Sequence, residues 1–323
     1  MLSGLPVLLT ALTADACFGY PAWLFARIRH PVTWIGRMIA ALEQRLNDPA
    51  RSASVRRSRG VATLAATVGA VALVAAGIEA AFRIALGGWA FLPVGLLAGS
   101  LIAQRSLHDH VARVAEGLDR SLAEGRAAVA HIVGRDPQSL DEPAVARAAI
   151  ESLAENFSDG VVAPAFYTAL AGLAGGAAYK AVNTADSMVG HRTPRHEAYG
   201  WAAARLDDGI NLPASRLSAG LLVLAAAIVP GCSATGAARA VLRDARRHRS
   251  PNAGWPEAAM AGALSLRLAG PRTYGGVTVP DHWMGDGTPA ATPGDIRRAL
   301  SVYRIACLLQ AGLWALLLTI LAV

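Results

Sequence analysis

Long apolar runs, separated by shorter polar stretches, dominate the pattern of the chain. They lie at about 4–25, 61–82, 85–104, 161–178, 217–230 and 302–323. A helix that spans a bilayer needs about 20 largely apolar residues, and the runs 61–82 and 302–323 meet that length. The sequence therefore predicts an all-α, polytopic integral membrane protein. A cleaved signal peptide is a competing interpretation of the first run, but that run has no basic segment before it.

Two of the apolar runs are weaker candidates for a complete span. The run 161–178 contains Pro164 and several glycines, and the run 217–230 is only about fourteen residues long. Segments of this kind can be re-entrant or half-buried elements instead of crossings. If both are re-entrant, the polar stretch between them faces the cytoplasm; if both cross, it faces outward. We expect the re-entrant arrangement.

The arginines indicate how the chain is oriented. The segment 26–60 carries eight arginines but only Glu43 and Asp48 as acidic residues, and loops rich in Lys and Arg stay on the cytoplasmic side. We therefore expect a multi-pass protein of the inner cell membrane with its polar site facing the cytoplasm. The predicted regions are an N-terminal membrane region 1–104 with a basic cytoplasmic loop 26–60 and a helical hairpin, a helical region 105–300 that carries the site, and a C-terminal membrane helix 301–323.

Composition decides how the positive charge is interpreted. Charged residues make up 16% of the 323 positions, against about 25% in soluble domains. A net charge of +7 would suggest nucleic-acid binding in a soluble protein, but here we attribute it to membrane orientation and expect no nucleic-acid partner. The three cysteines lie in or beside apolar runs and form no CxxC or His-rich cluster, so they indicate neither a zinc site nor a disulfide framework.

The first polar motif, RAAIESLAENFSDG, leads into the apolar run at 161. In a helix, Arg147, Glu151, Glu155 and Asp159 would share one stripe, with Asn156 beside it. A solvated helix face with one Arg–Glu pair would explain this pattern. Ionisable groups at a bilayer boundary are costly and often functional, so the carboxylates are also candidates for catalysis or metal binding.

The second motif is YKAVNTADSMVGHR, at 179–192. Asn183, Thr184 and Asp186 offer the oxygen ligands that Mg²⁺ prefers. Lys180 and Arg192 suit a phosphate or a carboxylate. A turn in which Asn183 or Thr184 caps the following helix would explain the spacing equally well.

The third motif, ARLDDGINLPASR, contains an adjacent acidic pair before a glycine. Asp207 and Asp208 could ligate a metal, position a nucleotide or cap a turn, and Arg205, Asn211 and Arg216 lie within a few residues. Three clusters of mixed charge at membrane boundaries suggest one polar site for an anionic substrate whose reaction is assisted by a metal.

The fourth motif, SPNAGWPEAAMAGAL, indicates a loop that enters a helix at Pro256, with Glu257 favourable in the first turn. The helix start does not explain why Asn252 and Trp255 accompany it. The region 277–295 is rich in Pro, Gly and Asp and is predicted to be a loop. The chain has no Walker motif and no GxGxxG motif, so a nucleotide would have to be bound by residues outside these motifs.

The four motifs in this order resemble those of the adenosylcobinamide-phosphate synthase family, membrane proteins of cobalamin biosynthesis. HPVTWIG at 30–36, AQRSLHDH at 103–110 and GRDP at 134–137 fit the same family, so the resemblance covers about residues 15–276. The chain departs from the expected family pattern at Tyr20, Lys180, Ala185 and Arg216. These departures put single roles in doubt, but they leave the family assignment in place.

The resemblance implies an amide-forming ligase that uses ATP and Mg²⁺. The family joins aminopropanol phosphate, or aminopropanol, to the remaining propionate carboxylate of adenosylcobyric acid, and the product is adenosylcobinamide phosphate. Activation of the acid as an acyl phosphate would precede attack by the amine. The protein could act as a homo-oligomer or together with other cobalamin-pathway enzymes.

The candidate residues fall into three groups. The catalytic carboxylates are expected to be Glu151, Glu155, Asp159, Asp186, Asp207 and Asp208. The groups that bind substrate or phosphate are expected to be Asn156, Lys180, Asn183, Arg192, Arg205, Asn211, Arg216, Asn252, Trp255 and Glu257. The metal ligands are expected to be Glu155, Asp159 and Asp186.

Two other classes of protein remain as alternatives. A transporter or binding protein for a corrinoid or another anionic substrate would also use Gly- and Pro-broken segments flanked by charge, although the sequence shows no internal repeat. A membrane alcohol phosphotransferase would use an acidic motif beside a span, but Pro164 stands where its arginine should be.

Overall fold

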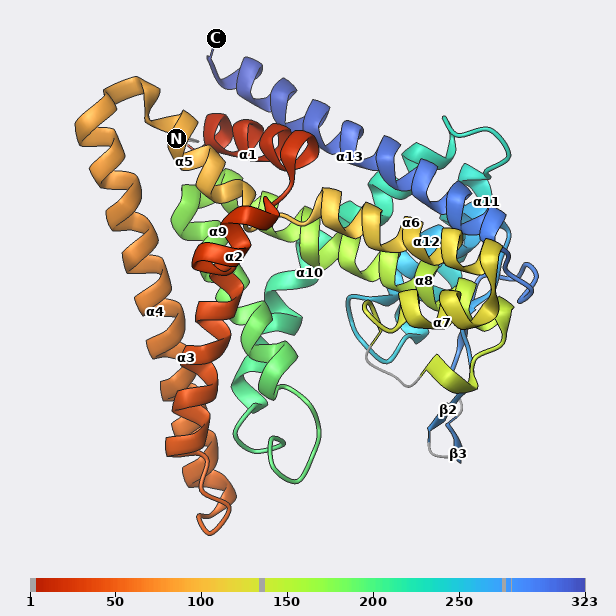
Figure 1. Ribbon diagram of the computed structural model, residues 1–323, viewed down its shortest axis with the longest axis horizontal. Helices are drawn as coiled ribbons and strands as arrows, with labels where there is room; N and C mark the ends of the chain where they lie inside the picture. Colours follow the sequence, from red (N-terminus) through yellow and green to blue (C-terminus); the bar gives the residue numbers. More distant parts are fainter. Residues whose placement is uncertain (1–3, 134–136, 275–276, 280, 323) are drawn as a thin grey trace. The chain divides into compact units, whose positions relative to one another are not determined.

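The computed structural model describes residues 4–133, 137–274, 277–279 and 281–322 (Figure 1). The chain forms two compact units. The first contains Met1–Ala103, Ala163–Asn211 and Trp314–Val323, and the second contains Gln104–Val162 and Leu212–Leu313. Most of the GRDP stretch lies outside the described residues.

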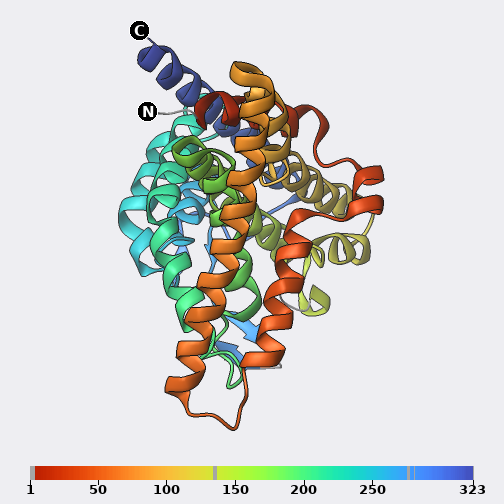
Figure 2. The same ribbon diagram turned by 90° about the vertical axis from the view of Figure 1, so that its left-hand side faces the viewer.

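The first unit is helical in the part of it that the structure describes. Its elements are α1 (Gly4–Phe18), α2 (Ala22–Ile28), α3 (Pro31–Leu46), α4 (Ala53–Leu86), the 3₁₀ turn η1 (Gly87–Ala90), α5 (Phe91–Gly99), α9 (Ala163–Val189), the first part of α10 (Trp201–Ala226) and the end of α13 (Pro293–Ala322). Figure 2 shows α3 running along α4.

The predicted hairpin reverses at η1, but its second arm is short. Ser52 caps the start of α4 through a hydrogen bond from the Val55 N–H, and Gly87 ends this helix with a φ of 54°, which glycine adopts readily. Helix α5 has nine residues, or about 14 Å, against about 30 Å of hydrocarbon. The apolar run 85–104 thus holds η1 and a helix that is shorter than a full span.

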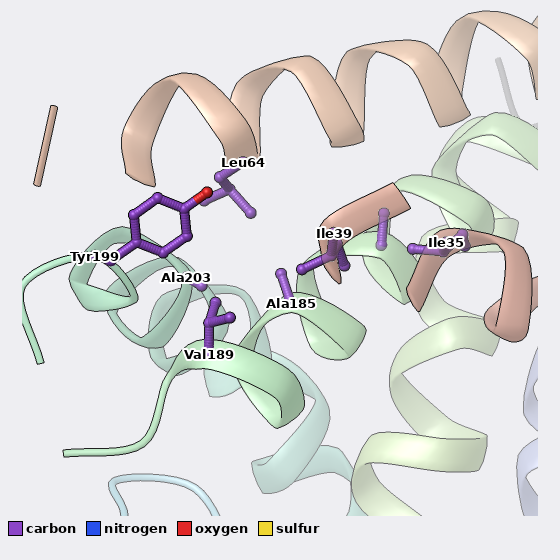
Figure 3. Packing of buried hydrophobic residues seen from close by; sticks show 8 residues of the cluster. Ile35, Ile39, Leu64, Ala185, Val189, Tyr199 and Ala203 are labelled. Atoms are coloured by element: carbon purple, nitrogen blue, oxygen red, sulfur yellow. The ribbon is translucent and has the colours of Figure 1, made fainter. Parts of the chain in front are cut away.

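The helices of the first unit pack around a cluster of buried hydrophobic residues (Figure 3). Ile39 of α3 and Leu64 of α4 pack in one buried cluster with Ala185 of α9. A Cβ on Gly60 would lie 1.8 Å from the Tyr199 carbonyl oxygen. Close packing over glycine and alanine is the usual way in which helices associate in membranes.

Helix α9 is broken in the middle. Gly172 has φ 62° and ψ −151°, a conformation that is essentially restricted to glycine. The break exposes the N–H of Leu173, which donates to Glu79 Oε2 of α4 at 2.9 Å. Glu79 is only 8% exposed, and its Oε1 accepts from Arg83 at 2.5 Å. A carboxylate from a neighbouring helix thus caps the second half of α9.

Four stretches within the described residues are long and apolar enough to cross a membrane. They are Ala53–Arg120, Glu142–Val189, Trp201–Ala226 and Pro293–Leu321. A fifth candidate is the pair Gly4–Phe18 and Ala22–Leu46, which is bent by 108°. The prediction of an all-α polytopic membrane protein is confirmed. The run 161–178 lies inside Glu142–Val189, and most of the run 217–230 lies inside Trp201–Ala226. Their re-entrant arrangement stays a prediction.

The second unit contains more helices and a few short strands. Its elements are α6 (Gln104–Arg120), α7 (Leu122–Val129), η2 (Pro137–Ser139), α8 (Glu142–Asn156), the π-helical turn η3 (Phe157–Val162), α11 (Ala234–Asp244), η4 (Ala245–Arg247), α12 (Gly254–Leu264), β1 (Leu268–Ala269), β2 (Arg272–Tyr274), β3 (Val277–Val279), β4 (Trp283–Met284) and the remaining parts of α10 and α13. Helix α12 has Pro256 and Glu257 in its first turn, as predicted.

Two short antiparallel strand pairs each place one strand, β3 or β4, in the region 277–295 that was predicted to be a loop. Leu268 of β1 is opposite Met284 of β4, and β2 pairs with β3. Strands of two or three residues are too short to produce a recognisable alternation of apolar and polar positions. The content of Pro, Gly and Asp therefore predicted a loop, and the sequence did not reveal the short strands within it.

A buried carboxylate ties α11 to the residue that follows β4. Asp244 is 2% exposed and accepts two hydrogen bonds from Arg243, at 2.8 and 2.7 Å, and one from the Gly285 N–H at 2.9 Å. Burial alone would raise the pKa of Asp244, but these hydrogen bonds outweigh it and hold the pKa below its usual value. Asp244 is therefore an ionised structural anchor.

Candidate functional site

A buried carboxylate lies at the centre of the polar cluster of the first unit. Asp207 of α10 is 8% exposed. Its Oδ2 accepts a hydrogen bond from Asn211 at 2.9 Å, and its Oδ1 accepts a longer one from Asn183 of α9 at 3.4 Å. The hydroxyl of Tyr179 donates to Asn211 Oδ1 at 2.9 Å. This chain of hydrogen bonds fixes the orientation of the carboxylate between the two helices.

Two further carboxylates lie near Asp207. Asp186 of α9 and Asp208 of α10 are half-buried, and electrostatic repulsion links all three. Arg192 and Arg205 are exposed, and both attract Asp208. A cation or a positively charged substrate group would relieve this repulsion, because an opposite charge favours the ionised form of a carboxylate.

An aromatic stack supports the cluster from one side. The rings of Tyr167 and Tyr179 are 5.4 Å apart and nearly parallel, at 9°. The hydroxyl of Tyr167 donates to the carbonyl oxygen of Ile210 at 2.8 Å, so the pair connects α9 to α10. The sequence analysis included Tyr179 in the motif but gave it no role, and it missed Tyr167 because a tyrosine in an apolar run carries no distinguishing signal.

The alternative that Asn183 or Thr184 caps a following helix is wrong. Both residues lie inside α9, which continues to Val189. Thr184 donates to the carbonyl oxygen of Lys180 at 2.7 Å, and Ser187 donates to that of Asn183 at 2.9 Å. These hydroxyls are satisfied within their own helix, whereas the Asn183 amide points to another helix.

The predicted acidic stripe continues as a regular helix only through α8, so it includes Glu151 and Glu155 but not Asp159. Glu151 is buried and accepts a hydrogen bond from the Ala269 N–H of β1 at 2.9 Å, while Glu155 and Asn156 are exposed. Asp159 is half-buried in the π-helical turn η3. The wider turn moves Asp159 off the stripe that a regular helix would give. Such π-helical turns occur often at functional sites.

Two residues of the fourth motif contact Arg216, the last residue of the third motif. Arg216 Nη1 donates to Asn252 Oδ1 at 3.0 Å, and its guanidinium lies 4.4 Å from the centre of the Trp255 ring. Glu257 is buried with His248 at 3.8 Å from its carboxylate. The sequence analysis gave this histidine no role, because no ligand spacing marks it.

The predicted residues therefore divide between the two units. The first unit holds Lys180, Asn183, Asp186, Arg192, Arg205, Asp207, Asp208 and Asn211, and the second holds Glu151, Glu155, Asn156, Asp159, Arg216, Asn252, Trp255 and Glu257. In the ranges that the structure describes, no three His, Cys, Asp or Glu side chains are grouped as they would be in a preformed metal site.

These features define a polytopic helical membrane protein that places clustered carboxylates and amides on helices of spanning length. Ionisable groups in such helices are retained for a function. The chain belongs to the CobD/Cbib protein family, whose model matches residues 8–303, so the resemblance seen in the motifs is confirmed.

Three relatives illustrate the match, and each is named cobalamin biosynthesis protein CobD. The protein of a Sinorhizobium species is 52% identical over 309 residues, which cover 95% of each chain. That of Rhodobacter capsulatus is 48% identical over 302 residues, or 93% of each chain. That of Brucella suis is 45% identical over 310 residues, which cover 95% of this chain and 94% of the relative. No solved structure matches the chain.

Proposed function

We propose that the protein acts in cobalamin biosynthesis as an adenosylcobinamide-phosphate synthase. It would join aminopropanol phosphate, or aminopropanol, to the propionate carboxylate of adenosylcobyric acid and use ATP to drive amide formation. The observation that carries the proposal is the buried carboxylate of Asp207, which accepts hydrogen bonds from Asn183 and Asn211. Asp186 and Asp208 interact electrostatically with it, and Arg192 and Arg205 attract Asp208. The names of the relatives support the pathway.

The reaction needs two bond-forming steps. A propionate oxygen attacks the γ-phosphorus of ATP, and ADP leaves. The amine nitrogen then attacks the acyl carbon, phosphate leaves, and the nitrogen gives up a proton. In our proposal the half-buried Asp186 or Asp208 accepts that proton, and Arg192 and Arg205 bind phosphate through their paired N–H groups. Holding both substrates in line supplies much of the rate increase.

The carboxylates of the first unit also fit a magnesium site of the open kind. Mg²⁺ is usually held by one or two carboxylates together with substrate phosphates and waters, and Asp186 and Asp208 are half-buried rather than enclosed. When bound there, Mg²⁺ would reduce the charge of the phosphates. The eight arginines of 26–60 support an inner-membrane orientation with the site facing the cytoplasm, where ATP is available.

The test is turnover by purified protein in detergent. Adenosylcobyric acid, aminopropanol phosphate, ATP and Mg²⁺ are supplied, each is omitted in turn, and the product is followed by mass. We expect an ATP-dependent gain of the aminopropanol phosphate unit, which Asp186→Asn and Glu155→Gln abolish. Glu142→Gln is the matched control, because Glu142 is exposed in the first turn of the helix that carries Glu155.

Intact substrates with a folded wild-type protein would refute the ligase proposal. Uptake of adenosylcobyric acid into vesicles that contain the protein would then support the transporter alternative.

A further inference from the structure

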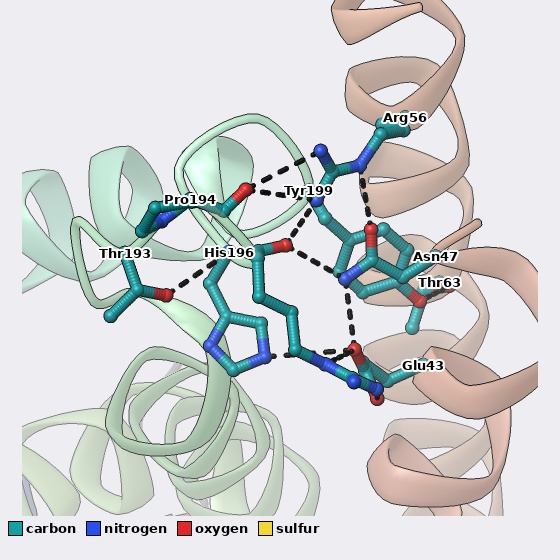
Figure 4. A network of polar contacts seen from close by, with 9 residues as sticks. Glu43, Asn47, Arg56, Thr63, Thr193, Pro194, His196 and Tyr199 are labelled. Atoms are coloured by element: carbon teal, nitrogen blue, oxygen red, sulfur yellow. Dashed lines mark hydrogen bonds and ion pairs between the residues drawn. The ribbon is translucent and has the colours of Figure 1, made fainter. Parts of the chain in front are cut away.

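The loop Gly190–Gly200, which joins α9 to α10, is fastened to α3 by a buried carboxylate (Figure 4). Glu43 is 7% exposed. Its Oε1 accepts from Arg195 Nε and its Oε2 from Arg195 Nη2, both at 2.8 Å. Nε2 of His196 lies 3.6 Å from Oε1. A bidentate Arg–carboxylate pair is a strong and geometrically specific contact.

A second set of bonds holds the backbone of the same loop. Asn47 donates to Glu43 Oε1 at 2.8 Å and to the Arg195 carbonyl oxygen at 2.9 Å. Arg56 of α4 donates from Nε to Asn47 Oδ1 at 2.9 Å, and its guanidinium also reaches the carbonyl oxygens of Pro194 and Arg195. The loop is thus bound through both side chains and carbonyl groups.

The end of the loop is fixed by packing. Tyr199 and Thr63 of α4 share a hydrogen bond at 2.6 Å. A Cβ on Gly200 would lie 1.6 Å from the carbonyl oxygen of Val189, at the end of α9. The loop therefore closes tightly on α9.

The fastened loop carries a candidate phosphate ligand. Arg192 and His191 lie just before the held residues, and they interact electrostatically with Asp208 and Asp186 respectively. Ordering a loop residue costs backbone entropy, and this loop has few helical hydrogen bonds of its own. The bonds from α3 and α4 offset that cost before substrate arrives.

We propose that Glu43, acting through Arg195, is a positioning residue that holds the loop so that Arg192 receives a substrate phosphate beside Asp186 and Asp208. The phosphate belongs either to the amine substrate or to ATP. The kinetic part of this inference rests on the proposed function, whereas the ordering of the loop does not.

The first experiment measures hydrogen–deuterium exchange of the detergent-purified protein. Glu43→Gln keeps the shape of the side chain but removes its charge. We expect faster exchange in 190–200 and unchanged exchange in α11 and α12. Arg59→Gln is the matched control, because Arg59 joins α4 to the carbonyl oxygen of Leu46 at 3.1 Å and forms no hydrogen bond or ion pair with the loop among the described contacts. The proposal would be overturned if residues 190–200 exchanged in E43Q at the same rate as in the wild-type protein. Faster exchange throughout the chain of E43Q would overturn it as well.

The second experiment compares kinetic constants. In E43Q we expect kcat/KM to fall on the order of 10- to 100-fold, the scale of a misplaced binding group, mainly through KM. A rise in KM for aminopropanol phosphate identifies the amine substrate as the source of the phosphate, and a rise in KM for ATP identifies the nucleotide. The E43Q/R195Q double variant should lose no more than E43Q alone.

The two experiments separate the two proposals. If E43Q loosens the loop but keeps both KM values, the positioning role is refuted. If the wild-type protein forms no product, the proposed function fails, and the exchange data still decide whether Glu43 orders the loop.

Discussion

Replacing Gly172 with alanine tests whether a glycine and a buried glutamate together create the break in α9. At φ 62° and ψ −151°, an alanine would be strained by about 1–3 kcal/mol. Its Cβ would also lie 2.5 Å from Glu79 Oε2, so Glu79 must move away. That movement breaks the hydrogen bond from the Leu173 N–H to a charged acceptor.

The two effects give the expected magnitude. Loss of a hydrogen bond to a charged group costs about 1.5–3 kcal/mol. Together with the backbone strain, Gly172→Ala should lower the free energy of unfolding by roughly 2.5–6 kcal/mol. Arg83 is half exposed at its side chain, so we assign no further loss to its ion pair with Glu79.

The assay is equilibrium unfolding in mixed micelles, followed by far-UV circular dichroism. Gly77→Ala is the matched control, because Gly77 lies on α4 with Glu79 and a Cβ there would meet nothing within 4 Å. It should raise stability by about 0.5–1 kcal/mol, as alanine does for glycine within a helix. If Gly172→Ala is as stable as the wild-type protein, the reasoning is wrong and the break does not depend on glycine.

Three further changes test the other anchors. Asp207→Ala leaves the buried Asn211 amide without its carboxylate acceptor and should cost about 1–3 kcal/mol in the same unfolding assay. The pKa of Asp244 lies below its usual value, so its carboxylate stabilises the fold at neutral pH. This contribution is lost as pH falls through the pKa of the folded state. The difference in melting temperature between the wild-type protein and Asp244→Asn should therefore shrink in acid. Trp255→Ala removes the ring under Arg216 and should cost about 0.5–2 kcal/mol, whereas Trp255→Phe should cost less by thermal melting.

The sequence predicted the fold class because apolar length alone distinguishes a membrane helix. It also predicted the start of α12, where proline and glutamate mark the first turn. It did not predict that the run 85–104 would yield a helix of only nine residues, nor that α9 would break at Gly172 rather than near Pro164. The break depends on a tertiary contact, since its carboxylate lies 94 positions away in the chain from the N–H that donates to it.

The candidate site was likewise predicted in part from the sequence and in part not. Spacing placed Asp186, Asp207 and Asn211 among the candidates, and the structure gathers these with Asn183 in one unit. Spacing could not reveal the π-helical turn that moves Asp159 off its stripe. It also gave no role to Glu43, because an acidic residue within a basic segment looks like an ordinary surface charge until its partners from 195 and 196 are known.

Two glutamates hold both ends of the α9 segment that carries Asp186 of the carboxylate cluster. Glu79 caps the segment where it starts, at Leu173, and Glu43 holds the loop that follows its end at Val189. Both come from the neighbouring helices α3 and α4, so the segment is fixed from one side at two points. Movement of Lys180, Asn183 and Asp186 relative to α3 and α4 then requires breaking a charged contact. Such rigidity would help the proposed ligase to align its two substrates.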